Sequence, residues 1–398
     1  MLNALGGMTS LKVLYVTNFW SGFSDVLKNP LSEPKGMPGF NLPLKKLVEE
    51  GVQVDFVIVS YQDQSIDNAV PWLQTAKMHF FNGLGFKNLY RLHNIIASNG
   101  YDFVYGHGCK PAFWANVFSN IYKIPCGVRL YGTFMITVIQ ENIFSAFVKH
   151  PYEFAIYNLP KKFLLVTDDG TKGDEVCSRF NLLNSSYDFH FWVNGIDVKY
   201  PEASFQPNED FHAPFLFCPA RFDRWKRQDM AIDIVKVLKS RGVIIQLVLC
   251  GHYFDKTYVS DLTKKIEENE VGELVTLQES MPKNDLYRRM VEATAMLFCY
   301  DFSNFGNVLI EACSLGALSI VRNDGSCDRV IINGETGILF DSIEQAADSI
   351  QAVINDQICS TSIRRDCKKL AAEIFMSWDQ RILSEINLVL VARGERGD

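Results

Sequence analysis

The stretch PFLFCPARFDRWKRQDMAIDIVKVLKSRG (residues 214–242) contains an apolar run, a charged loop and a helical pattern in direct succession. Residues 214–220 are apolar throughout, which is typical of a strand buried in a parallel sheet. After the loop, apolar side chains recur at the spacing of one helix face, at Met230, Ile234, Val237 and Leu238. Gly242 then provides a helix stop. A strand, a loop and a helix in this order form the repeating unit of an α/β fold.

The same alternation runs along the whole chain. Further strands are predicted at residues 12–17, 54–59, 103–108, 126–132, 163–168, 244–251, 274–279, 296–300 and 319–323. Residues 194–214 are polar and contain prolines, which is typical of a linker. The sequence therefore predicts two doubly wound α/β domains in series, residues 1–200 and 208–375. In such a pair the ligand binds between the domains, at the carboxyl ends of the strands.

Composition narrows the class of protein. A chain of 398 residues suits two domains, and 47% apolar with 21% charged residues argues against long disordered segments. The net charge of −7 argues against a nucleic-acid-binding protein. The ten cysteines include no CxxC pair, and the chain shows neither an apolar run of about 18 residues nor a secretion signal at its start. We therefore expect a cytoplasmic protein with buried, reduced thiols.

A single carboxylate interrupts the apolar stretch FGNVLIEACSLG (residues 305–316). This residue, Glu311, needs hydrogen-bond partners because an isolated buried charge is costly. Gly306 opens a predicted helix, and the first amides of that helix, at Asn307 and Val308, favour a phosphate group. One turn further on, Glu311 could accept two ribose hydroxyls. This stretch alone leaves open whether Glu311 binds a nucleotide or pairs with a residue of the protein.

Two cations accompany the first strand of this half. Arg221 lies at the end of the strand and Lys226 near the start of the following helix. Surface Arg and Lys residues are usually solvated charges. Because these two lie at the carboxyl end of a strand, we expect them to neutralise the phosphates of a leaving diphosphate.

With these residues in place, residues 208–375 resemble the donor-binding domain of a retaining, nucleotide-sugar-dependent glycosyltransferase of the GT-B type, family 4. Further matching motifs are LVLCGH with Gly251, FGNVLIEA with Glu311, and NGETGILF (residues 333–340). The first half matches more loosely, through LKVLYVTNF, GMPGF, YDFVYGHG and VNGID. SWDQRILSEI resembles the last helix of the family, which packs back onto the first domain, and we place that helix at about residues 376–398.

The resemblance implies two Rossmann-like domains that face a central cleft, with the acceptor on the N-terminal side and the nucleotide sugar on the C-terminal side. It implies that the leaving diphosphate contacts Arg221 and Lys226, and that Glu311 positions the donor. It assigns nucleotide contacts to Gly251, Phe305, Gly306, Asn307 and Val308. It also implies retention at the anomeric carbon, with no metal ion and no other cofactor. The glycines of KGMPGF would approach the diphosphate, although this loop also fits a plain turn: Gly36 and Gly39.

Three positions depart from the family pattern. Ser303 stands where the family commonly has the first of two glutamates, which contacts the donor sugar. Tyr131 stands where a histidine is frequent at the sugar-facing edge of the first domain, and Arg329 where a glutamate is common. The residues that would hold the nucleotide match the family pattern, whereas several that would face the sugar differ from it. The identity of the donor sugar is therefore left open. The acidic pair Asp168 and Asp169 has no His or Cys ligand nearby, and we interpret it as loop chemistry rather than a metal site.

Two amphipathic stretches bear on membrane contact. Residues 144–163 mix aromatic and basic side chains: Phe144, Phe147, Phe154, Tyr157, Lys149, Lys161 and Lys162. Such a mixture fits a surface on an anionic membrane that carries a lipid-linked acceptor. A core helix with polar flanks is the favoured interpretation, both here and at residues 40–50. Peripheral attachment to the inner face of the membrane is the alternative.

The leading hypothesis is an enzyme that moves a sugar from a nucleotide diphosphate sugar to a saccharide or polyprenyl-linked glycan acceptor. A role in bacterial surface polysaccharide synthesis follows from the resemblance alone. One alternative is a sugar-nucleotide epimerase of similar build. Another is a catalytically decayed nucleotide-binding subunit, which the three departures would explain. An NAD-dependent oxidoreductase is disfavoured because no GxGxxG follows the first strand.

Overall fold

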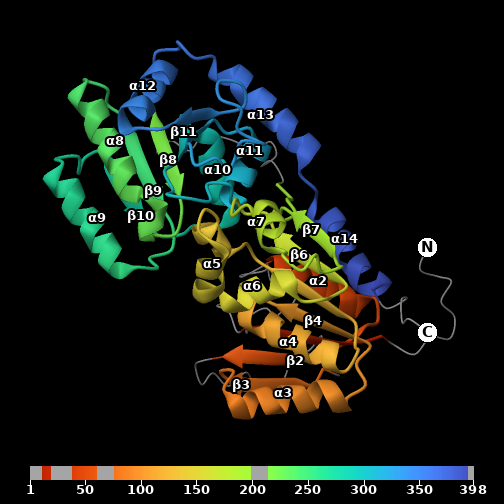
Figure 1. Cartoon of the computed structure of the whole chain (residues 1–398). Coiled ribbons are helices and arrows are strands. Elements are labelled where there is room, and N and C mark those ends of the chain that lie inside the picture. The colour runs from red at the N-terminus through yellow and green to blue at the C-terminus, as the bar shows by residue number, and fades with distance from the viewer. Residues whose placement is uncertain (1–10, 19–37, 61–75, 199–213, 393–398) are drawn as a thin grey trace. The chain divides into compact units, whose positions relative to one another are not determined.

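The computed structural model describes residues 11–18, 38–60, 76–198 and 214–392 (Figure 1). The chain forms two compact units, and each is described here by itself. Unit 1 comprises Met1–Asp168, Lys172–Gly195 and Ser377–Asp398. Unit 2 comprises Asp169–Thr171 and Ile196–Met376. The predicted linker lies largely outside the described residues.

Unit 1 is built on a seven-stranded parallel sheet in the order β3-β2-β1-β4-β5-β6-β7. Its strands are β1 (Lys12–Asn18), β2 (Gln53–Ser60), β3 (Met78–Asn82), β4 (Phe103–His107), β5 (Cys126–Leu130), β6 (Phe163–Thr167) and β7 (Asp188–Trp192). The central strands β4, β5 and β6 are buried over their full length. This burial explains why their sequences are apolar without alternation.

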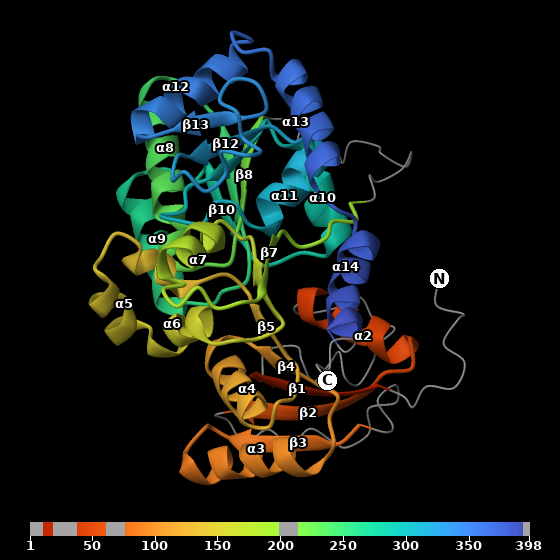
Figure 2. The same ribbon diagram turned by 45° about the vertical axis from the view of Figure 1, so that its right-hand side comes forward.

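Helices cover both faces of this sheet. They are α2 (Pro38–Glu49), α3 (Phe86–Ser98), α4 (Cys109–Ile121), η1 (Phe134–Val138), α5 (Ile143–Lys149), α6 (Pro151–Asn158), α7 (Gly173–Phe180) and α14 (Trp378–Val391). Figure 2 shows α2 and α14 side by side, and they pack on the same core, to which they contribute Phe40, Leu44, Leu47, Ile386 and Val389. The core on the other face includes side chains of α3, α4, α6 and α7.

Unit 2 is built on a six-stranded parallel sheet in the order β10-β9-β8-β11-β12-β13. The strands are β8 (Phe215–Pro219), β9 (Gln246–Cys250), β10 (Val275–Gln278), β11 (Ala295–Phe298), β12 (Ser319–Arg322) and β13 (Ile338–Phe340). Figure 2 shows α8 (Gln228–Ser240) and α9 (Lys256–Glu268) on one side of the sheet. On the other side lie α10 (Lys283–Glu292), α11 (Asn307–Leu315) and α13 (Ser360–Ile374). The short helix η2 (Arg224–Lys226) precedes α8. Helix α12 (Ile343–Ile354) packs against α8.

The predicted α/β class with two doubly wound parallel sheets is confirmed. Each predicted strand is present to within two residues, and α8 carries the predicted apolar face. Three strands escaped prediction, β3, β7 and β13, and all three are edge strands of their sheets. Both β3 and β7 are half-exposed and mix polar with aromatic residues, and β13 has three residues, so none gives a long apolar run. The predicted cleft between the domains stays a prediction.

Candidate active site

The strand order of unit 2 reverses between β8 and β11. In open α/β sheets such a switch point is where ligands bind, because the loops leaving the two strands diverge. The loop after β8 spans residues 220–227, and the loop after β11 spans residues 299–306. Between them they contain the predicted site residues Arg221, Lys226, Ser303, Phe305 and Gly306. The fold therefore brings residues about 80 positions apart to neighbouring strand ends.

Gly251, at the end of β9, packs directly against the loop after β8. A Cβ atom at this position would overlap the carbonyl group of Ala220 and lie 2.9 Å from the backbone nitrogen of Arg221. The amide of Phe222 also donates to the carbonyl of His252, at 2.9 Å. In the structure Gly251 thus positions the loop that carries Arg221. Its predicted contact with the nucleotide stays a prediction.

Lys226 is held between two aromatic rings. Its Nζ lies 3.6 Å from the ring centroid of Tyr300 and 3.7 Å from that of Trp225. Burial, followed by the nearby charge of Arg221, lowers the pKa of Lys226 to about 7, although Asp223 and Asp169 partly oppose the shift. Near neutral pH this amine is only partly protonated, so an anion bound beside it would draw in a proton.

Arg221 is more exposed and less firmly held. Its side chain is 49% exposed, and Nη2 lies 3.1 Å from a carboxylate oxygen of Asp223. The guanidinium also lies 4.7 Å from the ring centroid of Phe254. Exposed ion pairs contribute about 0–1 kcal/mol, so this one can exchange for a ligand at little cost.

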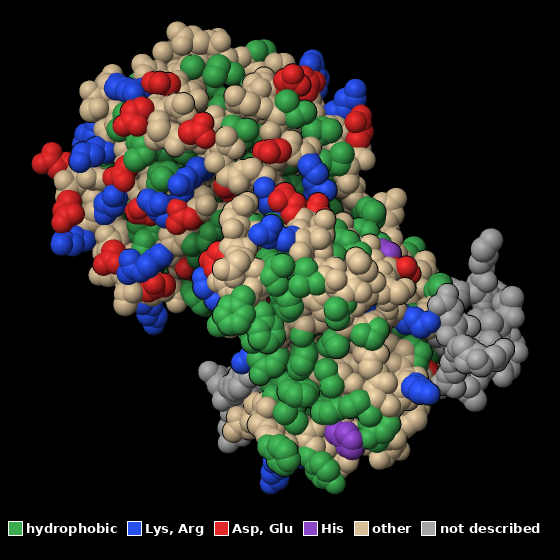
Figure 3. Space-filling model, viewed as in Figure 1, with side chains coloured by type: hydrophobic (Ala, Val, Ile, Leu, Met, Phe, Trp, Pro, Cys, Tyr) green, Lys and Arg blue, Asp and Glu red, His purple; other side chains and the backbone are tan. Residues whose placement is uncertain are grey.

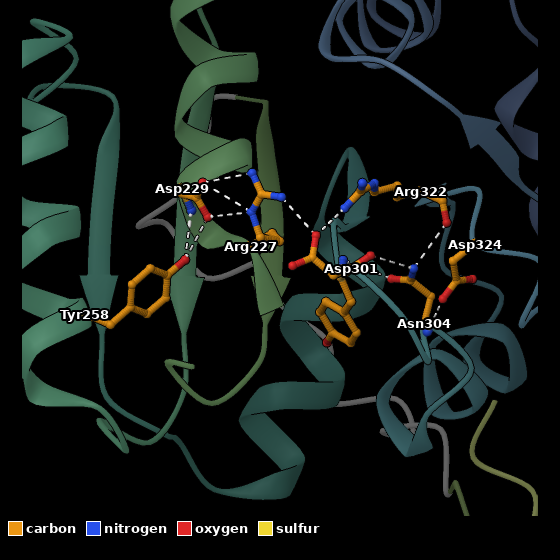
Figure 4. A network of polar contacts seen from close by, with 8 residues as sticks. Arg227, Asp229, Tyr258, Asp301, Asn304, Arg322 and Asp324 are labelled. Atoms are coloured by element: carbon orange, nitrogen blue, oxygen red, sulfur yellow. Dashed lines mark hydrogen bonds and ion pairs between the residues drawn. The ribbon is translucent and has the colours of Figure 1, made fainter. Parts of the chain in front are cut away.

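A network of ion pairs joins the two loops (Figure 4). Asp301 accepts hydrogen bonds from Arg227 at 2.9 Å and from Arg322 at 2.6 Å. Arg227 also binds the carboxylate of Asp229, which accepts a hydrogen bond from Tyr258 at 3.0 Å. The network therefore fixes the loop after β8 relative to the loop after β11.

Asn304 fixes the shape of the loop after β11. Its side-chain oxygen accepts from the amide of Tyr300 at 3.1 Å, and its Nδ2 donates to the carbonyls of Tyr300 and Arg322. Its own amide donates to Asp324 at 3.0 Å (Figure 4). Asn304 is fully buried, so each of these bonds also satisfies a group that water cannot reach. Asn304, Asp301 and Asp324 were not predicted as site residues, because one sequence does not show which polar residues meet.

Ser303 has a left-handed backbone conformation, with φ of 58°. Its hydroxyl donates to the backbone carbonyl of Asp169, which belongs to unit 2. The Asp169 carboxylate in turn accepts from the amide of Thr171 at 3.2 Å and from its hydroxyl at 2.6 Å. Asp169 thus closes a local turn, which agrees with its interpretation as loop chemistry. The sugar contact predicted for Ser303 stays a prediction.

Helix α11 begins beside this loop with an open N-terminus. Gly306 is the N-cap and has no side-chain cap, and the first helical hydrogen bond runs from the amide of Ile310 to the carbonyl of Gly306 at 3.1 Å. A Cβ atom on Gly306 would meet nothing within 4 Å. The space in front of the first turn, at Asn307 and Val308, suits an anion. Phe305, before it, is buried and donates its amide to Ser326 at 3.1 Å.

Glu311 has protein partners in the structure. Its carboxylate, 12% exposed, lies 3.0 Å from Nζ of Lys283 and accepts a hydrogen bond from Tyr287 at 3.2 Å. Burial lowers the pKa of Lys283, but Glu311 and Tyr287 outweigh it, and the pKa of Lys283 is raised. The lone carboxylate is thus satisfied within the protein. Lys283 is 57% exposed, so a ribose diol can replace it without leaving a buried ammonium.

The unit 1 candidates lie in tightly packed surroundings. The hydroxyl of Tyr131, just after β5, lies 3.0 Å from Nδ1 of His107, and burial raises its pKa. A Cβ atom on Gly39, in α2, would lie 2.9 Å from both Arg129 and Asn194. Both residues therefore have a packing role in the structure. Gly36 lies outside the described residues, and the ligand contacts predicted for these residues stay predictions.

The amphipathic stretches divide into core and surface. Helix α2 is a core helix as predicted, and so is α6, in which Tyr157 is buried. The core interpretation is wrong for α5, where Phe144 and Phe147 are 75% and 50% exposed. Lys161 is buried instead of exposed, and its Nζ donates to the carbonyl of Leu159.

The described part of the chain contains no group of three His, Cys, Asp or Glu side chains that could hold a metal ion. In the same residues, none of the helices combines the length and apolar character needed to cross a bilayer. Metal independence and a cytoplasmic location stay predictions.

The model of the protein family "Glycosyl transferases group 1" matches residues 200–373. The matched residues lie within unit 2, and the similarity is to a family of glycosyl transferases. The matched residues include all the candidate site residues of unit 2, from Arg221 to Glu311, and Arg329. No curated protein matches the chain.

Several solved structures match nearly the whole chain. Anabaena Alr3699/HepE in complex with UDP aligns with a TM-score of 0.70 and 15% identity, over 96% of this chain and 100% of that one. Sucrose-phosphate synthase from Thermosynechococcus elongatus aligns with a TM-score of 0.69 and 15% identity, over 96% of this chain and 98% of the synthase. A glycosyltransferase from Rickettsia africae aligns with a TM-score of 0.70 and 14% identity, over 97% of this chain and 99% of that one. At these identities the likeness establishes the fold, two Rossmann-like domains of the GT-B class.

Proposed function

We propose that this chain is a retaining glycosyltransferase that moves a sugar from a UDP-sugar to a saccharide or lipid-linked glycan acceptor without a metal ion. The observation that carries the proposal is the site at the switch point of unit 2. There an uncapped helix N-terminus and the partly neutral Lys226 lie on neighbouring loops, with Glu311 one turn into the helix. The match to the group 1 family and the UDP complex of a structure with the same fold support this assignment.

In the proposed site, the diphosphate of UDP lies against the first turn of α11, and Arg221 and Lys226 neutralise its charge. Lys226 takes up a proton as the anion arrives, because its pKa in the free protein is about 7. The ribose diol displaces Lys283 from Glu311, whose carboxylate then orients the donor. The loop braced by Asn304 and Asp301 keeps these groups in register.

The sugar would be transferred on the face from which UDP leaves. The acceptor oxygen forms a bond to the anomeric carbon as the bond to the phosphate oxygen breaks, and the acceptor proton passes to the departing phosphate. This step needs no pair of carboxylates at a fixed separation, unlike glycoside hydrolysis. Ser303 and Tyr131 remain candidates for sugar-side contacts, and a role in surface polysaccharide synthesis is part of the proposal.

A screen of UDP-sugars tests this function. Donor consumption is measured with and without EDTA on a mixture of saccharide and lipid-linked acceptors, and NMR gives the anomeric configuration of the product. Transfer with retention in EDTA is the expected result, whereas metal-dependent or inverting transfer would contradict the proposal. A decayed subunit is the second candidate, because Ser303 replaces the family glutamate and Glu311 is already paired. That alternative predicts UDP binding with no turnover of any UDP-sugar.

A further inference from the structure

A pocket of about 860 Å³ opens at the amino edge of the unit 1 sheet. Residues 122–126, 160–163 and 186–188 line it, at the starts of β5, β6 and β7. The end of α14 completes the lining, and all of these residues belong to unit 1. The volume lies within the range of about 300–1,000 Å³ that is usual for small-molecule sites. We name this cavity the amino-edge pocket.

The position of the pocket separates it from the predicted substrate sites. In open α/β sheets, substrates bind at the carboxyl ends of the strands. Tyr131, the sugar-side candidate of unit 1, follows the last residue of β5, whereas the pocket meets β5 at its first residue, Cys126. A ligand in the amino-edge pocket would therefore be bound in addition to the substrates.

The exposed apolar side chains of unit 1 lie elsewhere. Figure 3 shows hydrophobic side chains gathered on the face where α5 and α6 lie, and Phe144 of α5 is 75% exposed. None of the described residues that line the amino-edge pocket belongs to α5 or α6. The pocket is therefore distinct from this apolar surface.

The described lining residues carry an excess of positive charge. They include three lysines, Lys123, Lys161 and Lys162, and one carboxylate, Asp188. Asp188 is exposed, so water screens its charge, whereas Lys161 is 8% exposed. When all three lysines are protonated, three ammonium groups against one carboxylate leave an excess of two positive charges. This excess complements a phosphate monoester, which carries about −1.5 to −2 charges near neutral pH.

Lys161 has no carboxylate beside it in the described part of the chain. Its Nζ donates to the carbonyl of Leu159 and lies 3.8 Å from the ring centroid of Tyr187. One carbonyl and one ring leave part of its capacity unused, because an ammonium group has three donors. Burial lowers the pKa of Lys161 to about 7, and the groups that oppose the shift are the thiols of Cys126 and Cys177. A bound anion would supply the missing counter-charge.

Hydrogen bonds hold the walls of the pocket in place. Nδ2 of Asn120 donates to the carbonyl of Pro160 at 3.0 Å, which joins the end of α4 to the segment before β6. The hydroxyl of Tyr187 donates to the carbonyl of Tyr157 at 3.0 Å and so fixes the ring beside Lys161. A site whose walls are already ordered loses little conformational entropy when a ligand binds.

We propose that the amino-edge pocket is a second ligand site, which binds a phosphate monoester through Lys161, with Lys123 and Lys162 as further contacts. The ligand would lie against the end of α14 at Leu388 and Val391 as well as the strand starts. Because α14 also packs on α2, the ligand would stabilise the folded form of unit 1. The inference does not rest on the proposed function, since no predicted substrate-site residue takes part.

Labelling of the full chain with pyridoxal phosphate, itself a phosphate monoester, tests the proposal. Its aldehyde condenses with a neutral amine with loss of water, and borohydride reduces the imine to a stable secondary amine, which peptide mass spectrometry locates. Excess UDP is present throughout, so that Lys226 is covered if the proposed donor site is correct. We expect Lys161 to be labelled. Glycerol phosphate at several times its dissociation constant should slow this labelling at least about fivefold, whereas glycerol should not.

Two double variants show whether the other lysines of the pocket take part. Lys123→Met/Lys162→Met should lose the protection by glycerol phosphate, because two of the three cations are gone. Lys87→Met/Lys110→Met removes two exposed lysines of unit 1 outside the pocket and should keep it. Thermal melting of both variants should match that of the wild type, which shows that they are folded.

An unlabelled Lys161, or labelling that glycerol phosphate and glycerol slow alike, would overturn the proposal. Protection by succinate but not by glycerol phosphate would overturn the assignment to a phosphate. Removal of residues 393–398 should leave the protection unchanged; protection seen only in the shortened chain would show that the end of the chain fills the pocket. Labelling of Lys226 in excess UDP would contradict the proposed function and leave the result at Lys161 standing.

Discussion

The two units differ in how far their charged side chains are exposed to solvent. In unit 1, Arg129 and Arg381 share the carboxylate of Glu385, and all three side chains are at most 2% exposed. In unit 2, Arg221 and Lys283 are 49% and 57% exposed, and each is paired with a carboxylate through a surface contact.

The difference separates a structural cluster from a site that can bind a ligand. Glu385 also accepts a hydrogen bond from Tyr105 at 2.9 Å, so the cluster ties α14 to β4 and β5. Its members cannot change partners without stranding a buried charge. Glu311 of unit 2 can change partners, because its partner Lys283 is 57% exposed. Substitutions should therefore affect stability in unit 1 and ligand binding in unit 2.

The largest effect is expected from Glu385→Ala. The substitution leaves two buried guanidinium groups without their carboxylate and should lower the free energy of unfolding by about 3–5 kcal/mol. Thermal or urea unfolding measures it, with Glu373→Ala, an exposed carboxylate on α13, as the control. A loss no larger than that of the control would show that the buried cluster does not hold α14 in place.

Lys226→Met should weaken UDP binding and at the same time stabilise the free protein. The loss of a charge-assisted contact to the diphosphate predicts roughly 10–100-fold weaker binding, measured by calorimetry. Removal of a poorly solvated amine should raise the unfolding midpoint by about 2–4 °C, which corresponds to about 1 kcal/mol. Lys236→Met, on the exposed face of α8, is the matched control. Equal affinities for UDP would remove Lys226 from the site.

The stability gain of Lys226→Met should depend on pH. The folded pKa of about 7 lies below the unfolded value of about 10.4, so the folded protein binds fewer protons between these values. Wild-type stability attributable to Lys226 therefore rises from pH 7 to pH 10. The advantage of the variant should be largest below pH 7 and disappear near pH 10, and unfolding curves across this range check it.

Binding of UDP at pH 8 should take up close to one proton. The diphosphate is already ionised at this pH, so the uptake reports the rise in the pKa of Lys226 from about 7. Calorimetry in buffers of different ionisation enthalpy measures it. Lys226→Arg, which stays charged, should bind UDP with no uptake. Proton uptake that persists in this variant would have to come from another group.

The smallest effect is expected from Lys283→Met. The exposed ion pair with Glu311 contributes at most about 1 kcal/mol, so its loss should tighten UDP binding by up to about fivefold. Lys256→Met, a substitution in α9 of the same unit, provides the comparison. Weaker binding in Lys283→Met would mean that the lysine contacts the nucleotide and does not compete with it.

Local sequence was enough to predict the fold class and the strands other than β3, β7 and β13, because apolar runs are visible in a few residues, whereas the roles of the unit 2 candidates stay predictions. The features that could not be predicted are contacts between residues far apart in the sequence. Arg129 and Glu385 are 256 positions apart, and Arg227 and Asp301 are 74 apart, so neither pair shows in a local pattern. The pairing of Glu311 with Lys283 and Tyr287 was left open for the same reason. The error on α5 arose because periodicity shows that a helix is amphipathic without showing which face is covered.

Thermal stabilisation by UDP, with and without Mg²⁺, on the wild type and on Glu311→Ala tests the central claim most directly. UDP at about 100 times its dissociation constant should stabilise the wild type by roughly 2.7 kcal/mol in EDTA. Glu311→Ala should lose most of this response, while Glu335→Ala, an exposed carboxylate of unit 2, should keep it. Full stabilisation of Glu311→Ala by UDP, or none of the wild type, would show that Glu311 serves only its pairing with Lys283 and Tyr287.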